Sequence, residues 1–243
     1  MISFVIPAYN EELLIAGTLT ALRDAARSAG EPHEILVVDD GSSDRTAAVA
    51  QELGVQVVRV NYRQISATRN AGAREASGDR LVFVDADTRV HGALVRAAVE
   101  AMRAGAVGGG SIVRFDEPLP AYARLLVPLL VALMRSARLA AGCFLFCTRE
   151  AFDAVGGFDE KVYGAEEIFM SQALGRQGRF VVLRECAITS GRKLRLHSGR
   201  ELLRAMMHLF SGGLRSVESR EALDLWYHPR REDPATEKPA KSA

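Results

Sequence analysis

The sequence predicts an α/β protein with one mostly parallel central sheet flanked by helices. Runs of apolar, strand-forming residues alternate with helical segments along the chain, which is the pattern of βαβ units with right-handed crossovers. With 243 residues, 48% of them hydrophobic, the chain can bury a substantial core. We expect a single domain at 1–228 and a disordered tail at 229–243, because the last segment is rich in Pro, Lys, Glu and Ala.

The predicted strands are short apolar runs that end at turn-forming or acidic residues. Pro7 is expected to stop the first strand, because proline has no N–H to donate to a sheet. Gly41 suits the tight turn that follows the second strand. We place strands at 2–6, 34–38, 55–60, 81–84, 106–113, 142–147 and 180–183.

Helices fill most of the intervals between these strands. Glu11 and Glu12 lie in the first turn of the first helix, where acidic side chains complement the helix dipole. Ser43 or Asp44 is a suitable N-cap for the second helix. We place helices at 11–29, 45–53, 66–76, 91–102, 149–155, 168–176 and 200–210.

Two segments have strongly amphipathic helical patterns, 118–140 and 200–210. In the first, apolar residues cover most of the helix and the basic residues share one side: Arg124, Arg135 and Arg138. Such a helix either packs on the sheet or lies on an anionic membrane surface on the acceptor side. The longest apolar run, 125–134, is too short to span a bilayer.

The composition excludes some partners and locations. The 31 basic and 30 acidic side chains nearly cancel, which argues against a nucleic-acid binder. Three cysteines without metal-ligand spacing indicate reduced, mostly buried thiols. The first strand begins at Ile2, so we expect no signal peptide and a cytoplasmic location, with peripheral attachment to the inner face of the membrane as the alternative.

Two carboxylates follow the central strand 81–84. In an extended chain Asp85 and Asp87 point the same way, with the small Ala86 between them. Like charges this close repel unless a cation lies between them or one takes a proton. Carboxylate oxygens suit Mg²⁺ or Mn²⁺ bound together with substrate phosphates. The pattern therefore predicts a metal–nucleotide site at the carboxyl edge of the sheet, although an Asp-rich turn that caps the next helix has the same sequence.

Other nucleotide-binding motifs are absent from the sequence. There is no Gly-x-Gly-x-x-Gly after the first strand and no Walker-type lysine loop. Arg69, on a helix of small residues, either faces a phosphate or is a solvated surface charge. A nucleotide must therefore be held in another way.

Five segments, in order, resemble the family 2 glycosyltransferases with the GT-A fold. They are Phe4-Val5-Ile6-Pro7-Ala8-Tyr9-Asn10-Glu11-Glu12, Val37-Val38-Asp39-Asp40-Gly41-Ser42-Ser43-Asp44, Arg69-Asn70-Ala71-Gly72, Asp85-Ala86-Asp87, and Gly156-Gly157-Phe158-Asp159-Glu160 with Glu166-Glu167. Each segment alone is a weak indication of the family, but their order and spacing together are specific for it. The resemblance covers about residues 2–183.

The resemblance implies a nucleotide-diphosphate-sugar site. Its donor-binding residues would be Pro7, Ala8, Tyr9, Glu11, Asp39, Arg69, Asp85, Ala86 and Arg192. Asp39 would accept a hydrogen bond from the base, and Asp87 with Asp85 would hold Mg²⁺ or Mn²⁺. His197 is either a further metal ligand or a surface residue, and Arg192 either clamps the diphosphate or belongs to a solvated basic loop.

The resemblance also implies a catalytic base for the acceptor hydroxyl. Glu167 is expected ahead of Glu166, and the alternative is that both only stabilise a helix N-terminus. The family commonly has Glu-Asp here, with the Asp as base, so Glu167 departs from the pattern by one methylene group. Inversion at the anomeric centre is the family-based expectation, although some related enzymes retain configuration.

The expected division is a nucleotide-sugar-binding half at 1–113 and an acceptor and base half at 114–228. The donor is expected to be of the UDP or GDP type, and the acceptor is either lipid-linked or a saccharide. A nucleotidyltransferase is the rival enzyme, but it would need a Gly-rich, basic loop after the first strand. A non-catalytic nucleotide-sugar sensor or scaffold on the same fold is the other alternative.

Overall fold

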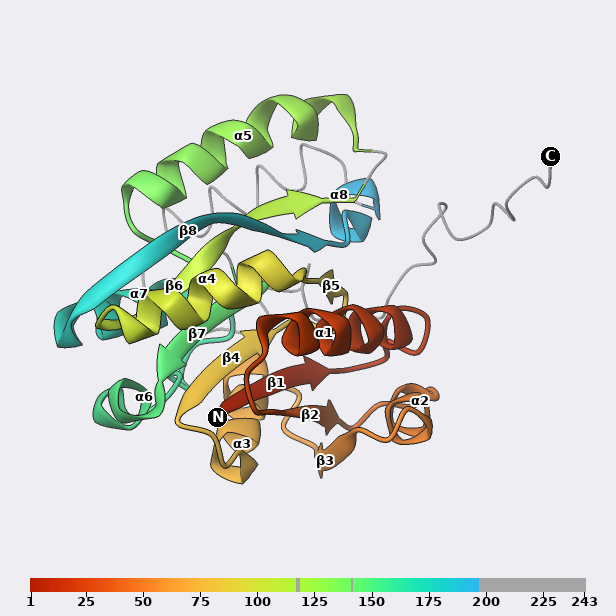
Figure 1. The fold of residues 1–243 in the computed structure, drawn as a ribbon. Helices are drawn as coiled ribbons and strands as arrows, with labels where there is room; N and C mark the ends of the chain where they lie inside the picture. The colour runs from red at the N-terminus through yellow and green to blue at the C-terminus, as the bar shows by residue number, and fades with distance from the viewer. Residues whose placement is uncertain (117–118, 141, 197–243) are drawn as a thin grey trace.

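A computed structural model of the protein describes residues 1–116, 119–140 and 142–196. Its centre is an eight-stranded sheet with the strand order β3-β2-β1-β4-β7-β6-β8-β5 (Figure 1). The strands are β1 Ile2–Ala8, β2 His33–Asp40, β3 Gln56–Val60, β4 Arg80–Val84, β5 Thr88–Arg89, β6 Ala106–Phe115, β7 Phe144–Thr148 and β8 Arg179–Thr189. Strands β1 to β4 pair in parallel, whereas β7 is antiparallel to both β4 and β6. The prediction of a mostly parallel sheet is confirmed.

Helices cover both faces of the sheet and form two hydrophobic layers. The helices are α1 Ile15–Ala29, α2 Thr46–Glu52, α3 Ile65–Glu75, α4 Gly92–Arg103, α5 Ala121–Ser136, α6 Arg149–Val155, α7 Glu166–Gln177 and α8 Arg192–Leu196. Phe4 and Ile6 of β1 pack in the layer with α1 and α4, and Val5 packs in the layer with α3, α6 and α7. Because both faces are covered, the parallel strands are nearly continuous apolar runs.

The strand β1 does not end before Pro7, as the sequence suggested, but continues to Ala8. Its pairing with β4 extends only from Ile2 to Val5, whereas its pairing with β2 reaches Ala8 opposite Asp39. Beyond Val5 the β4 side needs no ladder donor, so a proline is tolerated at this place.

Other boundaries also differ from the prediction. The strand expected at 180–183 is β8, which continues to Thr189 along β6, and the two-residue β5 was not expected. The helix expected from 11 begins at Ile15, because a turn closes first, in which the amides of Leu14 and Ile15 donate to the carbonyl of Glu11 at 3.0 and 2.9 Å. The basic loop expected at 190–193 instead leads into α8, which begins at Arg192.

Gly72 lets α3 lie directly on the sheet. A Cβ atom at this position would be 2.3 Å from Val5 Cγ1 and 2.7 Å from Val38 Cγ2. Carbon atoms do not approach this closely, and a packed interior has little room to move aside. The small residue therefore sets the spacing between α3 and strands β1 and β2.

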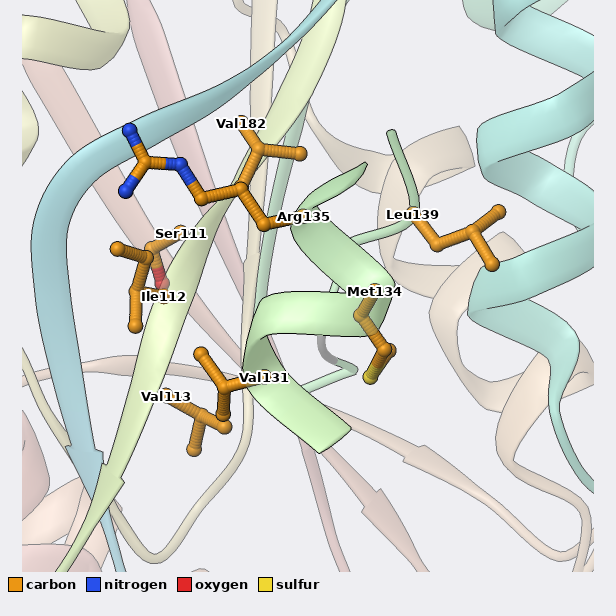
Figure 2. Close-up of a pocket in the computed structure, with 8 residues that line it drawn as sticks. All are labelled: Ser111, Ile112, Val113, Val131, Met134, Arg135, Leu139 and Val182. Carbon is orange, nitrogen blue, oxygen red and sulfur yellow. The ribbon is translucent and has the colours of Figure 1, made fainter. Parts of the chain in front are cut away.

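The helix predicted within 118–140 is α5, which packs on β6 (Figure 1). Figure 2 shows a narrow, mostly apolar hollow between them, lined by Ser111, Ile112, Val113, Val131, Met134, Arg135, Leu139 and Val182. Within the described ranges, no helix is long and apolar enough to cross a bilayer. The predicted helix 200–210, the tail 229–243 and His197 lie outside the described residues, and the division of the domain after residue 113 stays a prediction.

Candidate active site

The ends of β1, β2 and β4 lie at one edge of the sheet, because these strands are parallel and adjacent. Ala8 is paired with Asp39, so the loops that follow β1 and β2 start side by side. The segment 85–87 follows β4 at the same edge. The topology therefore brings together the segments that the sequence singled out, at the edge where open α/β sheets bind ligands.

Two neighbouring carboxylates at the end of β2 have different roles. Asp40 accepts hydrogen bonds from the amides of Tyr62, Arg63 and Gln64 at 2.6, 2.8 and 3.0 Å, and another from the Thr68 hydroxyl at 2.9 Å. It fixes the loop between β3 and α3. Asp39 is also buried, but among the described residues its Oδ1 has no hydrogen-bond partner. A buried carboxylate oxygen without a donor is costly, so Asp39 is an acceptor suited to a ligand N–H.

The loop after β1 is tied to the loop after β2. Asn10 has a left-handed backbone, with φ of 51°, its side chain accepts from the Ser43 amide at 2.8 Å, and its own amide donates to Ser42 Oγ at 3.0 Å. Beside it, the Arg63 guanidinium lies 3.5 Å from the centroid of the Tyr9 ring, a cation–π contact. Arg63 could not be identified from the sequence, because the contact depends on how the loop after β3 folds over Tyr9.

Arg69 is the buried centre of the site. It is 1% exposed, and it donates through Nη2 to Asp85 Oδ1 at 2.9 Å and through Nη1 to Glu166 Oε1 at 2.8 Å. Burial alone would lower the pKa of Arg69, but the charges of Asp85, Glu166 and Glu167 outweigh it and raise the pKa above its ordinary value. Arg69 is therefore not a solvated surface charge. It joins the carboxylate after β4 to the one that begins α7.

Glu166 and Glu167 occupy the first turn of α7, after Ala165 in a left-handed conformation with φ of 57°. Glu166 is buried in its ion pair with Arg69. Burial and, to a smaller extent, the charge of Glu166 raise the pKa of Glu167 from an ordinary 4.5 to about 8, although Arg69 acts in the opposite direction. A carboxyl group with this pKa can take up and release a proton near neutral pH. Glu167 is thus the better candidate base.

Gly142 lies between Arg69 and Glu167. Its carbonyl accepts a hydrogen bond from Arg69 Nη2 at 3.0 Å, and a Cβ atom on it would be 3.0 Å from Cδ of Glu167. The segment that precedes α7 is held in a similar way by Asn70, which accepts from the Phe158 amide and donates to the Phe158 carbonyl, both at 2.9 Å. The sequence motifs contained Asn70 without indicating this role.

Asp87 is positioned by a threonine that sequence reasoning missed. Thr189, at the end of β8, donates through Oγ1 to Asp87 Oδ1 at 3.1 Å, and Thr88 donates to Thr189 Oγ1 at 2.9 Å. The carbonyl of the buried Ala86 accepts from the Thr18 hydroxyl at 2.8 Å. The short pairing of β5 with β8 therefore fixes the segment 85–87. Only the length of β8, which the sequence underestimated, brings Thr189 to this position.

The donor set fits a hard divalent ion that takes part of its coordination from a substrate. Within 1–116, 119–140 and 142–196, no three His, Cys, Asp or Glu side chains are grouped to hold a metal ion. Asp85 and Asp87 offer two carboxylates separated by a single residue, Ala86. Mg²⁺ or Mn²⁺ commonly binds through one or two carboxylates together with phosphates and water. His197 lies outside the described residues.

Arg192 is placed over the loop after β1. Its Nη2 lies 3.2 Å from Glu11 Oε1, and both side chains are mostly buried. The helix α8 that carries it is anchored twice more, by Arg195 Nη1 on Asp116 Oδ1 at 2.9 Å and by the Tyr122 hydroxyl on the Leu194 carbonyl at 2.7 Å. Glu11 and Arg192, two of the predicted donor-binding residues, are distant in the sequence but contact one another.

A largely parallel sheet, with an acid pair at the end of β4 and a second acid pair at the start of α7, agrees with the GT-A resemblance of the sequence. A sequence model of the family described as Glycosyl transferase family 2 matches residues 3–156, which is more than half of the chain. The chain belongs to this family.

Curated relatives match a shorter region. An undecaprenyl-phosphate 4-deoxy-4-formamido-L-arabinose transferase of Serratia proteamaculans is 40% identical over 94 residues, which are 35% of this chain and 28% of the relative. The protein of the same name from Pseudomonas paraeruginosa is 42% identical over 95 residues, 36% of this chain and 28% of the relative. The chain thus matches less than a third of the length of these relatives.

Solved structures match nearly the whole chain. A mannosyltransferase from Pyrobaculum calidifontis, in complex with GDP-Man and Mn²⁺, has a TM-score of 0.68 at 18% identity and covers 96% of this chain and 66% of its own. Glucosyl-3-phosphoglycerate synthase from Mycobacterium tuberculosis, with Mn²⁺ and UDP among its ligands, has a TM-score of 0.59 at 22% identity and covers 85% of this chain and 75% of its own. At these identities the likeness shows the fold, and the GT-A prediction is confirmed.

Proposed function

We propose that the protein transfers a sugar from a nucleotide-diphosphate sugar to an acceptor oxygen, with Glu167 as the base and Mg²⁺ or Mn²⁺ on Asp85 and Asp87. The observation that carries this proposal is the buried Arg69, which contacts both Asp85 and Glu166 and so holds the metal side and the base side of the site together. A site that only bound a nucleotide would not need this link.

The nucleotide is proposed to lie over the ends of β1 and β2. Asp39 Oδ1, which has no partner among the described residues, accepts an N–H from the base, which uracil and guanine both offer. Pro7, Ala8 and Tyr9 form the adjoining wall, and Arg63 extends it across the Tyr9 ring. Structural neighbours solved with GDP-Man or UDP support a donor of the GDP or UDP type.

The diphosphate is proposed to lie between the acids of 85–87 and α8. A divalent ion bound there would act as a Lewis acid that stabilises the charge of the departing diphosphate. Thr189 orients Asp87 and Arg69 orients Asp85. Arg192 is held over the same edge by Glu11 and would exchange this partner for a phosphate oxygen when the donor binds.

Glu167 is proposed to take the proton of an acceptor hydroxyl, which then displaces the nucleotide in line and inverts the anomeric centre. A pKa of about 8 matches this role near neutral pH. Glu166 is a positioning residue, because its carboxylate is engaged with Arg69.

A lipid phosphate is a second candidate acceptor, because the curated relatives are named as undecaprenyl-phosphate transferases. A phosphate oxygen is already ionised and needs no base. Glu167→Gln separates the two cases: turnover falls by about 10² or more if the acceptor is a hydroxyl, and is largely kept if it is a phosphate.

Turnover of a panel of UDP-, GDP- and dTDP-sugars, with and without Mn²⁺, tests the main proposal. We expect one donor class to be turned over only with metal, and Asp87→Asn to lower this rate by about 10² or more. Asp24→Asn, which removes an exposed acid from α1, is the matched control and should change nothing. Nucleotide-sugar binding without turnover, even with lipid-phosphate and saccharide acceptors added, would indicate the sensor alternative instead.

A further inference from the structure

The helix α5 turns large apolar side chains toward solvent. Leu125, Leu129 and Leu133 are 76%, 69% and 63% exposed, and their spacing of four residues places them in one stripe along the helix. Leu126 and Leu130 extend the stripe on one side and are also exposed. We name these five leucines the leucine face. So large a contiguous apolar surface marks an interaction site.

The other side of α5 already has a partner. Val131, Met134 and Arg135 line the hollow against β6 and β8 (Figure 2), and Ala123 is buried. The helix is therefore seated on the sheet, and the leucine face remains as a second apolar side that no described residue covers. Packing against β6 cannot account for it.

The charges on the segment that carries the leucine face are all positive. Residues 119–140 contain no Asp or Glu, and the three arginines among them, Arg124, Arg135 and Arg138, are exposed. An apolar stripe bordered by arginines matches a surface that is apolar below and anionic above, as the interface of an anionic bilayer is.

Both ends of α5 are tied to the candidate active site. Near its start, the Tyr122 hydroxyl bonds the Leu194 carbonyl of α8, the helix whose Arg192 contacts Glu11. After its end, the Ala140 amide donates to Ser171 Oγ of α7 at 3.1 Å, and the same hydroxyl donates to the Glu167 carbonyl at 2.6 Å. A surface that binds α5 is therefore connected to the elements that carry the donor and base residues.

We propose that the leucine face of α5 docks on the surface of an anionic membrane and so brings the catalytic edge to an acceptor that is itself a membrane lipid. The identity of the acceptor rests on the proposed function, whereas the docking does not. The leucines enter the boundary between headgroups and acyl chains, and the arginines contact lipid phosphates.

Charge argues against two other occupants of this face, a second copy of the chain and the segment 200–210. In a two-fold dimer the same patch would meet itself, which would bring the arginines of both copies together without any acid on 119–140 to pair with them. The segment 200–210 of the same chain has a single acid, Glu201, beside Arg200 and Arg204, and so offers little complementary charge.

Vesicle co-sedimentation of the full chain tests the docking. We expect binding to vesicles rich in phosphatidylglycerol, much weaker binding to pure phosphatidylcholine, and a loss of affinity between about 50 and 500 mM salt. The triple variant Leu125→Ser, Leu129→Ser, Leu133→Ser should bind at least about tenfold more weakly at every salt concentration. Leu13→Ser, at a leucine that is 74% exposed outside α5, is the matched control and should bind as the wild type does.

The arginines are tested separately. Replacing Arg124, Arg135 and Arg138 with Gln should remove the salt-dependent part of vesicle binding, whereas the same change at the exposed Arg27, Arg74 and Arg176 should remove much less. Equal binding by the leucine variant and the wild type would overturn the proposal. Absence of binding to any vesicle would also overturn it. Light scattering would then show whether the leucine face instead forms a dimer, which the leucine variant would abolish, or whether the protein is a monomer.

Nucleotide-sugar binding by the leucine variant, measured in solution, separates this proposal from the proposed function. The variant should bind the donor as tightly as the wild type, because its three substitutions lie on an outer surface. If the wild type docks but binds no nucleotide sugar, the proposed function fails and the docking stands.

Discussion

Two arginines approach the candidate site from different parts of the chain, and their surroundings differ. Arg69 lies beneath the carboxyl edge, fully buried, with Asp85, Glu166 and the Gly142 carbonyl as partners. Arg192 lies over the loop after β1, has 15% of its side chain exposed against 2% for Arg69, and pairs with Glu11 at 3.2 to 3.4 Å. A charge buried among several partners is part of the folded framework, whereas a less buried charge, whose side chain contacts one carboxylate at a longer distance among the described residues, can change partners. We therefore expect Arg69 to keep its partners, and Arg192 to exchange its partner when a ligand binds.

The largest effect is expected from Arg69→Met. The substitution leaves Asp85 and the buried Glu166 without their cation, so the free energy of unfolding should fall by about 3–5 kcal/mol and activity should be lost. Urea unfolding measures the fall. Arg74→Met, at an exposed position on the same helix α3, is the control and should change the unfolding free energy by less than about 0.5 kcal/mol. A similar result for the two variants would mean that the buried pairs do not hold the framework together.

An intermediate effect, dependent on pH, is expected from Glu167→Gln. Because burial raises the pKa of Glu167 to about 8, the folded protein holds this proton more tightly than the unfolded chain does. Stability of the wild type should therefore fall as the pH rises from about 5 to 8, and the variant should lack this part of the fall. The two unfolding free energies should diverge by more than about 1.4 kcal/mol over that range, which corresponds to one pKa unit. Parallel pH profiles would contradict the raised pKa.

The smallest effect on stability is expected from Arg192→Gln. The unfolding free energy should fall by about 1–2 kcal/mol, less than for Arg69→Met, because one carboxylate, Glu11, rather than two loses this partner, while the KM for the donor should rise about tenfold, because a charge-assisted contact to the diphosphate is lost. Arg195→Gln, on the same helix α8 but paired with Asp116, is the control and should leave KM unchanged. If Arg192→Gln destabilised the protein as much as Arg69→Met, the contrast between the two arginines would disappear.

The sequence was sufficient for the parts of the fold that depend on local pattern. Buried parallel strands read as apolar runs, and the acids that follow β2 and β4 mark the ends of those runs, so the sheet and its functional edge were predicted. The length of β8 was missed because polar residues such as Arg184 and Glu185 interrupt its second half. Its extension depends on pairing with β6, which is a tertiary property.

The sequence indicated candidate residues for the site but not how these residues contact one another. The burial of Arg69 could not be inferred from a helix of small residues, because its partner Glu166 is distant in the sequence and is reached only through the loop that Asn70 holds. Thr189 and Arg63 carried no motif, and only contacts made in the folded chain identify them. Positions 39 and 40 are both Asp, and only the structure shows that Asp40 accepts hydrogen bonds from the chain while Asp39 Oδ1 has no partner within the part of the chain that the structure describes.

The geometry of the candidate site depends on Gly72, a residue that has no side chain and takes no part in the chemistry. Arg69 is three residues earlier on α3, and that helix can rest no closer to the sheet than the contacts of Gly72 with Val5 and Val38 allow. Any side chain at this position would lift the helix and withdraw the guanidinium from both of its carboxylates together. Homologous proteins that change this glycine should therefore also change the length or position of the cation that joins their two acids, so residue 72 and residue 69 are expected to vary as a pair over evolutionary time.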